Sequence, residues 1–226
     1  MPAVIELKNV TKTYHLGSEV LNALDAISLS IQAGDFVAIT GPSGSGKTTL
    51  ANIIGGLDRP TSGSVLVDGY DLSGLRDAQL SAYRNQHIGF VFQSFNLQAT
   101  NTALENVILP LVFQKMSSKK RKDRGIECLQ AVGLGDRVKH KPSQLSGGQR
   151  QRVAIARALA IKPSIIIADE PTGNLDSARG KEIMMLLHDL NKQGITLIII
   201  THDDDIARQA GRRMEIHDGK LVERRG

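Results

Sequence analysis

The sequence has little of what stabilises secreted or membrane-embedded proteins. It holds a single cysteine among 226 residues, so Cys128 cannot form an internal disulfide, and a reducing compartment is expected. Apolar runs such as Ile165 to Ala168 and Leu197 to Ile200 are far shorter than the about 20 residues that cross a bilayer. Met1 to Glu6 lacks the basic and apolar regions of a signal peptide. We therefore expect a soluble, cytoplasmic chain with Cys128 as a small apolar side chain in a helix.

Repeats, low-complexity segments and an excess of one charge are also missing. Hydrophobic residues make up 41% and charged residues 23%, a balance typical of globular domains. The net charge of +5 is concentrated in a basic run from Lys115 to Arg124, which we interpret as the solvated start of a helix. No aromatic residues interleave with this run, so it lacks the stacking platform of a single-strand nucleic-acid binder.

Hydrophobic patterning predicts an α/β protein. Alternating or β-branched segments predict strands at 4–7, 27–31, 35–40, 64–67, 164–168 and 195–200. The first third therefore reads as strands and turns, whereas the pattern is helical from about 100 to 160 and again over 178–192. Strand, crossover helix and strand imply a mainly parallel sheet, into which the helical middle is inserted.

The strongest motif is a glycine-rich loop that follows the strand at 35–40. It matches the phosphate-loop pattern over Gly41, Pro42, Ser43, Gly44, Ser45, Gly46, Lys47 and Thr48. Glycines let backbone N–H groups surround phosphate oxygens, and the helix beginning near Lys47 adds its N-terminal dipole. Lys47 is expected to reach the β- and γ-phosphates of a nucleotide, and the Thr48 hydroxyl to bind Mg²⁺.

Two carboxylates follow the strand at 164–168. Asp169 and Glu170 come at its carboxyl end, the edge at which α/β sheets bind ligands. Asp169 is expected to hold Mg²⁺, and Glu170 to polarise the water that attacks the γ-phosphate. The alternative is a strand ending in a polar turn, since Pro171 follows at once.

A second helix start has the features of an anion site. Its residues are Leu145, Ser146, Gly147, Gly148 and Gln149. Ser146 and Gln149 match a capping box, as Thr102 and Glu105 also do. Two glycines after the cap leave backbone N–H groups free to approach a ligand, at the start of a helix predicted over 150–160. In a pair of subunits, one ATP could lie between this helix start and the phosphate loop; the alternative is a plain helix cap.

These motifs, in this order, resemble the nucleotide-binding subunit of ATP-binding cassette (ABC) transporters over essentially the whole chain. The resemblance implies an α/β phosphate-loop ATPase core with a mainly parallel sheet, an N-terminal antiparallel β subdomain and an inserted helical subdomain. Residues 1–226 then form one domain, with its core at about 1–93 and 163–226 and the helical subdomain at about 94–162.

The resemblance also implies roles for further residues. Tyr14 would stack on adenine, and Thr49 would extend the ATP-binding loop. Gln93 would touch both Mg²⁺ and the attacking water, and His202 would contact the γ-phosphate. The interface loop of the family corresponds to Asn174, Leu175 and Asp176. Two such chains would associate head to tail on binding ATP and Mg²⁺, with Ser146 of one completing the phosphate site of the other.

Finer similarity points to the MacB/LolD-type branch. The phrases that carry it lie at 55–63, 102–107 and 168–176, whereas residues 98–101 depart from the branch at the surface expected to face a membrane partner. The resemblance implies a peripheral ATPase on the inner face of the cell membrane. It would power a separate permease for export, efflux or lipoprotein release, with no nucleic acid as partner.

Two alternatives use the same phosphate loop. A soluble ABC ATPase acting on DNA or ribosomes is favoured only by the basic run, since this chain has neither a long coiled coil nor a second cassette. A small-molecule kinase or GTPase would leave the Ser146 loop without a role. The segment 191–194 also fails the guanine motif at its last position.

Overall fold

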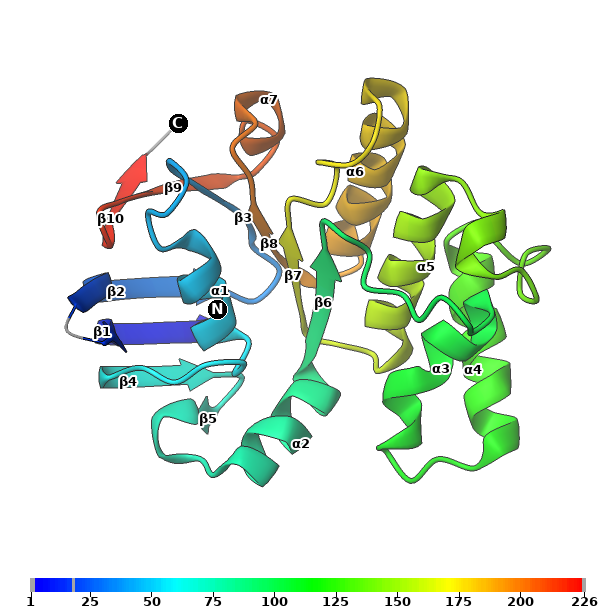
Figure 1. Ribbon diagram of the computed structural model, residues 1–226, viewed down its shortest axis with the longest axis horizontal. Coiled ribbons are helices and arrows are strands. Elements are labelled where there is room, and N and C mark those ends of the chain that lie inside the picture. Colours follow the sequence, from blue (N-terminus) through cyan, green and yellow to red (C-terminus); the bar gives the residue numbers. More distant parts are fainter. Residues whose placement is uncertain (1–2, 18, 225–226) are drawn as a thin grey trace.

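The computed structural model describes residues 3–17 and 19–224, which form two sheets and a group of helices at one end (Figure 1). The larger sheet has six strands in the order β10-β9-β3-β8-β7-β6. All neighbours are parallel except β10, which pairs antiparallel with β9. Its strands are β3 (Phe36–Thr40), β6 (Ile88–Phe92), β7 (Ile165–Asp169), β8 (Thr196–Ile200), β9 (Arg212–His217) and β10 (Lys220–Arg224).

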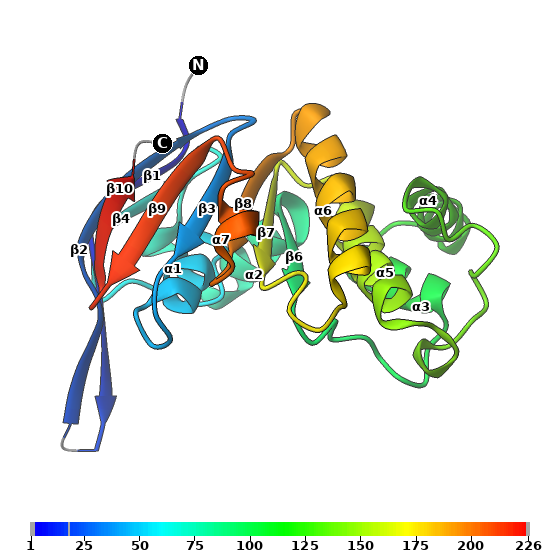
Figure 2. The same ribbon diagram turned by 90° about the horizontal axis from the view of Figure 1, so that it is seen from above.

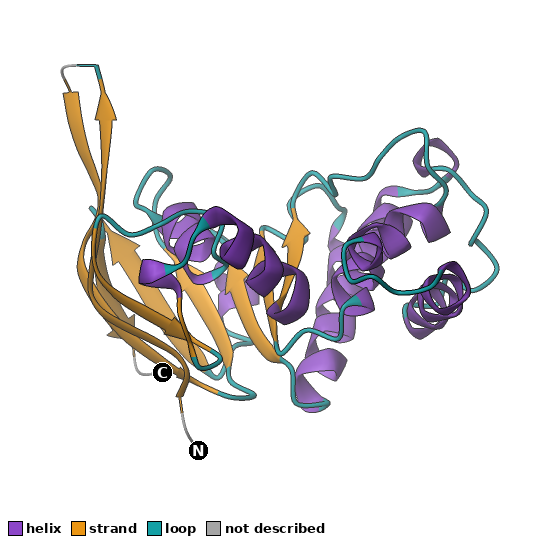
Figure 3. Ribbon diagram, turned by 90° about the horizontal axis from the view of Figure 1, so that it is seen from below, coloured by secondary structure: helices purple, strands orange, loops and turns teal. Residues whose placement is uncertain are grey.

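The smaller sheet is antiparallel and has the order β2-β1-β4-β5. It consists of β1 (Ala3–Leu16), β2 (Glu19–Gln32), β4 (Ser62–Val67) and β5 (Tyr70–Asp71). The predicted turn at 68–69 joins β4 to β5. Figure 2 shows the far ends of β1 and β2 projecting as a hairpin beyond the rest of the sheet, as does Figure 3 from below.

The α-helices are α1 (Lys47–Ile54), α2 (Asp77–His87), α3 (Ala103–Val112), α4 (Ser118–Ala131), α5 (Gly147–Ala160), α6 (Ser177–Lys192) and α7 (Asp204–Ala207), with short 3₁₀ turns at Leu72–Gly74 and Pro142–Gln144. The predicted capping boxes at Thr102 and Ser146 are confirmed. The expectation that helix α5 begins at Arg150 was wrong by one turn, because Ser146 caps a helix that includes both glycines. The basic run begins α4, where Cys128 is buried as expected.

The interpretation of the first third as strands and turns was incomplete, because α2 lies between β5 and β6. Only Leu80 and Tyr83 of α2 are buried. A helix with so little apolar surface shows no clear 3.6-residue hydrophobic pattern, so the sequence gives no signal for it.

The parallel strands are buried on both faces, as their β-branched composition predicted. Successive side chains point to opposite sides, so Ile165 and Ile167 pack with α1 and the antiparallel sheet. Ile166 and Ala168 face the other way, where they pack with residues of α3, α5 and α6. The expected α/β class with an antiparallel β part and added helices is therefore confirmed.

Helices α3, α4 and α5 pack on one another at the end of the molecule away from the antiparallel sheet (Figures 1 and 2). Within residues 3–17 and 19–224, every helix is too short or too polar to cross a membrane.

Candidate functional site

Neighbouring parallel strands of the six-stranded sheet end at the same level. Ile200 of β8 pairs with both Ile39 of β3 and Asp169 of β7, and Asp169 pairs with Phe92 of β6. The residues that follow these strands therefore emerge along one edge of the sheet. This edge brings together the phosphate loop, the two carboxylates, Gln93 and His202, which are far apart in the sequence.

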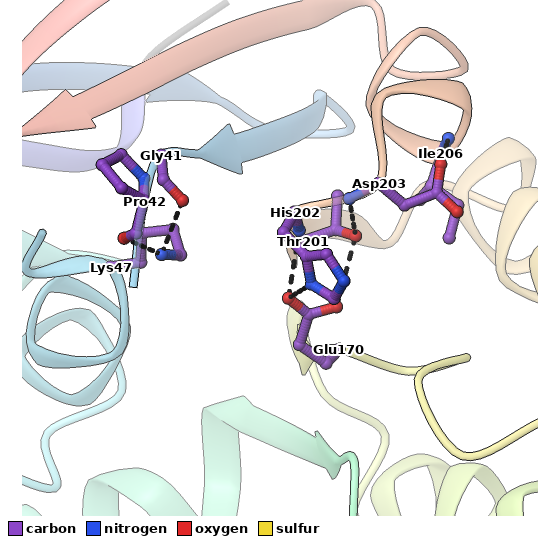
Figure 4. Close-up of polar contacts among 8 residues, drawn as sticks. All are labelled: Gly41, Pro42, Lys47, Glu170, Thr201, His202, Asp203 and Ile206. Atoms are coloured by element: carbon purple, nitrogen blue, oxygen red, sulfur yellow. Dashed lines mark hydrogen bonds and ion pairs between the residues drawn. The ribbon is translucent and has the colours of Figure 1, made fainter. Parts of the chain in front are cut away.

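The phosphate loop lies between β3 and α1, as predicted. The Lys47 Nζ donates hydrogen bonds to the carbonyl oxygens of Gly41, at 2.9 Å, and Pro42, at 2.7 Å (Figure 4). Its ammonium group is thus held over the loop itself. An ammonium has three donors, so the same group can bind an anion that enters the loop.

The loop conformation depends on glycine at its junction with α1. Gly46 caps α1 with φ of 107°, and a Cβ there would lie 2.3 Å from the carbonyl oxygen of Ala23. Gly44 also has positive φ, but a Cβ there would meet no atom within 4 Å. Ser43, Gly44 and Thr48 are exposed. The Ser45 hydroxyl is buried and has no hydrogen-bond partner in the described part of the chain, so a polar group of the loop remains available.

Asp169 ends β7 beside the phosphate loop. Burial raises the pKa of this carboxyl, the negative charge of Glu170 raises it further, and the positive charge of Lys47 opposes both. Two neighbouring carboxylates of this kind are stabilised by a cation. The described residues contain no cluster of three or more His, Cys, Asp or Glu side chains suited to a metal ion. One carboxylate with hydroxyl and amide oxygens nevertheless suits Mg²⁺, which usually keeps waters and phosphate ligands.

Glu170 is fixed by the strand next to its own. Its backbone N–H donates to the Ile200 carbonyl at 2.9 Å, with Glu170 in the left-handed conformation at φ of 47°. Its carboxylate accepts a hydrogen bond from the backbone N–H of His202 at 3.0 Å and contacts the His202 Nδ1 at 2.6 Å. The Thr201 hydroxyl donates to its second oxygen at 3.4 Å (Figure 4).

The His202 ring is exposed, whereas the Glu170 side chain is only 17% exposed. The hydrogen bond with Glu170, supported by its charge, raises the pKa of His202. The carboxylate is therefore held by Thr201 and His202, the two residues that follow β8.

Gln93 and the predicted interface loop contact each other. The Asn174 Nδ2 donates to the Gln93 carbonyl at 2.8 Å, and the Gln93 amide lies against Gly173. Asp176 caps α6 by accepting from the Arg179 N–H. The loop at 174–176 is therefore connected both to the start of α6 and to the residue after β6.

The Ser146 loop belongs to another part of the surface. Ser146 is exposed and caps α5, with the Gln149 side chain bonded back to its N–H at 3.0 Å. Gly147 lies against Leu175 and Gly148 against Arg179, so the loop contacts the start of α6. Leu145 is buried. Figures 1 and 2 both place α5 and α1 on opposite sides of β7, so one chain does not bring this loop to Lys47.

Tyr14 lies near the end of the β1–β2 hairpin, paired with Leu21. Its hydroxyl donates to the Asp58 Oδ2 at 2.6 Å, which connects the hairpin to the segment after α1. Thr49, in the first turn of α1, lies near the Tyr14 hydroxyl and partly opposes the rise in the pKa of Tyr14.

Several residues of this surface were missed by the sequence analysis. Asp58 contacts Tyr14, 44 residues away in the sequence, and Arg157 contacts Asn96, 61 residues away. No local sequence pattern predicts contacts between residues so far apart. Arg157 donates to the carbonyl oxygens of Asn96 at 2.5 Å and Phe95 at 2.9 Å. Thr201 was detectable, because it stands beside His202 at the end of a buried strand.

Comparison with known proteins gives the family. The model of the family "ABC transporter" matches residues 24–173. The chain is 52% identical to the ABC transporter ATP-binding protein YvrO of Bacillus subtilis over 97% of this chain and 96% of that protein. It is also 52% identical to the macrolide export ATP-binding/permease protein MacB of Salmonella choleraesuis, over 98% of this chain but 34% of MacB.

A solved structure agrees with these relatives. The dimeric, post-hydrolysis structure of the ATP-binding cassette MJ0796 bound to ADP and phosphate superposes with a TM-score of 0.89, at 50% identity, and covers 98% of this chain and 99% of that one. The sequence and the fold of this chain thus both match those of ABC transporter ATP-binding proteins. The chain belongs to the ABC transporter family, as a subunit that hydrolyses ATP to energise a permease.

Proposed function

We propose that two copies of this chain bind two ATP molecules between them, head to tail, and that hydrolysis of the ATP drives a separate membrane permease. The permease would carry out export, efflux or lipoprotein release. The observation that carries the proposal is the common edge of the sheet, where Lys47 and its loop lie beside Asp169, Glu170 and His202.

Each residue at this edge has a chemical task in the proposal. On ATP binding, the Lys47 ammonium replaces its carbonyl partners with phosphate oxygens, while the loop N–H groups and the start of α1 bind the remaining phosphate charge. Glu170 accepts a hydrogen bond from the attacking water and orients it toward the γ-phosphate. The hydrogen bonds from Thr201 and His202 to Glu170 keep that carboxylate in position.

Mg²⁺ fits the polar groups at this edge. Thr48, Gln93 and Asp169 would hold it, and the raised pKa of the Asp169 carboxyl reflects burial and a neighbouring negative charge that a cation would relieve. When bound, the ion would neutralise charge that builds up on the phosphates.

The proposed dimer is supported by the position of the Ser146 loop. The loop lies at the exposed N-terminal end of α5, away from the phosphate loop of its own chain. The loop can therefore bind the phosphates of an ATP only if that ATP is held by a second copy. Asn174 and Leu175 contact Gln93 and Gly147 respectively, which supports a role for residues 174–176 at the interface. The MJ0796 relative is dimeric with ADP and phosphate bound.

A groove supports the proposed permease contact. Its volume is about 630 Å³, and its lining includes Leu57, Phe90, Asn96, Leu109, Phe113 and Arg157. Leu109, Val112 and Phe113 are 36%, 48% and 74% exposed, and a group of exposed apolar side chains is typical of a partner-binding surface. The MacB relative is named as an ATP-binding and permease protein, so we propose a permease segment as the occupant. The chain would then be peripheral at the inner face of the cell membrane.

The groove lies between two parts of the chain. We propose that residues 1–93 and 163–226 form the ATPase core and residues 94–162 a helical subdomain within one domain. The basic run begins a surface helix and has no interleaved aromatic rings, so we expect no nucleic-acid partner.

ATP hydrolysis by three variants tests the proposal. We expect Glu170→Gln to abolish Mg²⁺-dependent turnover while ATP still binds, because the amide cannot polarise water. Lys47→Ala should lose ATP binding. Glu182→Gln is the matched control, since Glu182 is exposed and pairs with Arg152 on the surface. Turnover by Glu170→Gln at the rate of the control would contradict the proposal.

A further inference from the structure

The Tyr14 side chain is held in a network with Lys12 and Asp58, beside the segment that follows the phosphate-loop helix. Its hydroxyl donates to one Asp58 oxygen at 2.6 Å. The Lys12 Nζ donates to the other oxygen at 2.7 Å and to the Arg59 carbonyl at 2.8 Å. The Lys12 side chain is 13% exposed and that of Asp58 29% exposed, so these contacts are largely shielded from solvent.

Lys12 also covers the Tyr14 ring. Its Nζ lies 4.8 Å from the ring centroid, the geometry of a cation–π contact. A planar group can stack on Tyr14 only from the face that Lys12 leaves free. The network thus determines both the position of the ring and the face it offers.

The protonation states suit a strong hydrogen bond. Burial raises the pKa of Tyr14, and the hydrogen bond to Asp58 raises it further. Burial opposes ionisation of Asp58, but hydrogen bonds from Lys12, Tyr14 and the Arg59 N–H outweigh it and lower the pKa of Asp58. A neutral phenol therefore donates to an ionised carboxylate, which is stronger than a hydrogen bond between neutral groups.

Asp58 is itself attached to α1. The backbone N–H groups of Leu57 and Asp58 both donate to the Asn52 carbonyl, at 2.7 and 3.1 Å. Since α1 begins at Lys47, the Tyr14 ring has a fixed position relative to the phosphate loop. The distance between a base stacked on the ring and a phosphate chain bound in the loop would then be fixed.

We propose that Asp58 and Lys12 are positioning residues that orient the Tyr14 ring toward the nucleotide base and so connect base recognition to the phosphate loop. The inference rests on the proposed function and on the contact of Tyr14 with adenine that the family resemblance implies. The competing explanation is that Asp58 only stabilises the turn after α1, in which case its loss affects stability and not base recognition.

Dissociation constants for ADP and for pyrophosphate, which lacks the base, separate these explanations. Tyr14→Phe keeps the ring and removes only the hydroxyl, and we expect about three- to tenfold weaker ADP binding, equal to about 0.7–1.4 kcal/mol, with pyrophosphate binding unchanged. Asp58→Asn and Lys12→Met should act in the same direction. Tyr14→Phe combined with Asp58→Asn should be no worse than the stronger single change, because both break one network. Tyr70→Phe, at an exposed tyrosine, is the matched control.

A spectroscopic titration gives an independent readout. The chain has three tyrosines and no tryptophan, so phenol ionisation can be followed by ultraviolet absorption. The raised pKa of Tyr14 should fall toward its ordinary value of about 10 in Asp58→Asn, because the carboxylate that accepts the phenol hydrogen bond and repels the phenolate is removed. Should Asp58→Asn fail to fold, Tyr14→Phe and Lys12→Met still decide the question.

Tyr14→Ala separates the positioning role of Asp58 and Lys12 from the contact of Tyr14 with the base. If Tyr14→Ala weakens ADP selectively while Tyr14→Phe, Asp58→Asn and Lys12→Met leave ADP binding unchanged, the positioning role is wrong and the base contact stands. If Tyr14→Ala changes ADP and pyrophosphate binding equally, or neither, the base contact and this inference both fail. The ATPase results for Lys47 and Glu170 would be unaffected by either outcome.

Discussion

Arg157 of α5 is expected to stabilise the segment that follows Gln93. Its guanidinium donates to the carbonyl oxygens of Asn96 and Phe95 at 2.5 and 2.9 Å. Both of these residues are in the left-handed conformation, which is strained for side chains of this kind. Replacing Arg157 by alanine removes the groups that hold this conformation.

The magnitude follows from the two hydrogen bonds. A hydrogen bond with a charged group contributes about 1.5–3 kcal/mol. Burial lowers the pKa of Arg157, so desolvation of the guanidinium offsets part of this gain. We expect Arg157→Ala to lower the free energy of unfolding by about 2–4 kcal/mol. Arg157→Lys should lose much of the same free energy, because an ammonium cannot present a planar fork to two carbonyls.

Urea denaturation and amide hydrogen exchange measure this effect. Exchange at residues 94–97 should accelerate in Arg157→Ala before the core strands are affected. Arg208→Ala is the control, since among the described residues the exposed Arg208 side chain forms an ion pair with Asp205 alone, at 3.2 Å, a contact worth less than about 0.5 kcal/mol. Unchanged exchange at 94–97, with destabilisation no larger than in the control, would refute the reasoning.

Three further predictions concern the loop, the histidine and the cysteine. Gly46→Ala should destabilise the fold by about 2–4 kcal/mol, against about 1–2 kcal/mol for Gly44→Ala. Both variants place a Cβ on a backbone with positive φ, but only at Gly46 does that Cβ also clash with another backbone segment. Equal urea midpoints for the two variants would contradict this. The raised pKa of His202 means that its contact with Glu170 stabilises the fold below the unfolded pKa of about 6.5 and is lost as pH rises through the folded value. His202→Gln should therefore lower the Tm at about pH 5.5 and leave it unchanged at about pH 9; equal Tm loss at both would refute the assignment. Burial raises the pKa of the Cys128 thiol, so a thiol reagent should modify native protein far more slowly than protein in urea, and equal rates would show that Cys128 is accessible.

The sheet edge was predictable because its signals are local. The runs at 164–168 and 195–200 are β-branched, and the structure has strands Ile165–Asp169 and Thr196–Ile200. Parallel strands align their carboxyl ends, so the residues that follow them lie along one edge; the role of His202 was implied by the family resemblance and not by this pattern. The helix predicted over 178–192 was found as Ser177–Lys192.

The contacts that position the site were not predictable in the same way. The contacts of Tyr14 with Asp58 and of Arg157 with Asn96 join segments that are 44 and 61 residues apart in the sequence and neighbours only in the fold. The contact between Glu170 and His202 also depends on a left-handed residue after β7, a conformation that a glutamate rarely adopts and that no pattern in the sequence indicates.

The mass of Glu170→Gln in solution tests the central claim most directly. Light scattering on a sizing column, without nucleotide and then with ATP and Mg²⁺, compares the 24.4 kDa chain with its dimer. The account predicts a monomer without ATP and a dimer with it, and a return to monomer when Ser146→Arg is added to the same chain. A protein that binds ATP and stays monomeric would contradict the proposal that the Ser146 loop completes the phosphate site of a second copy.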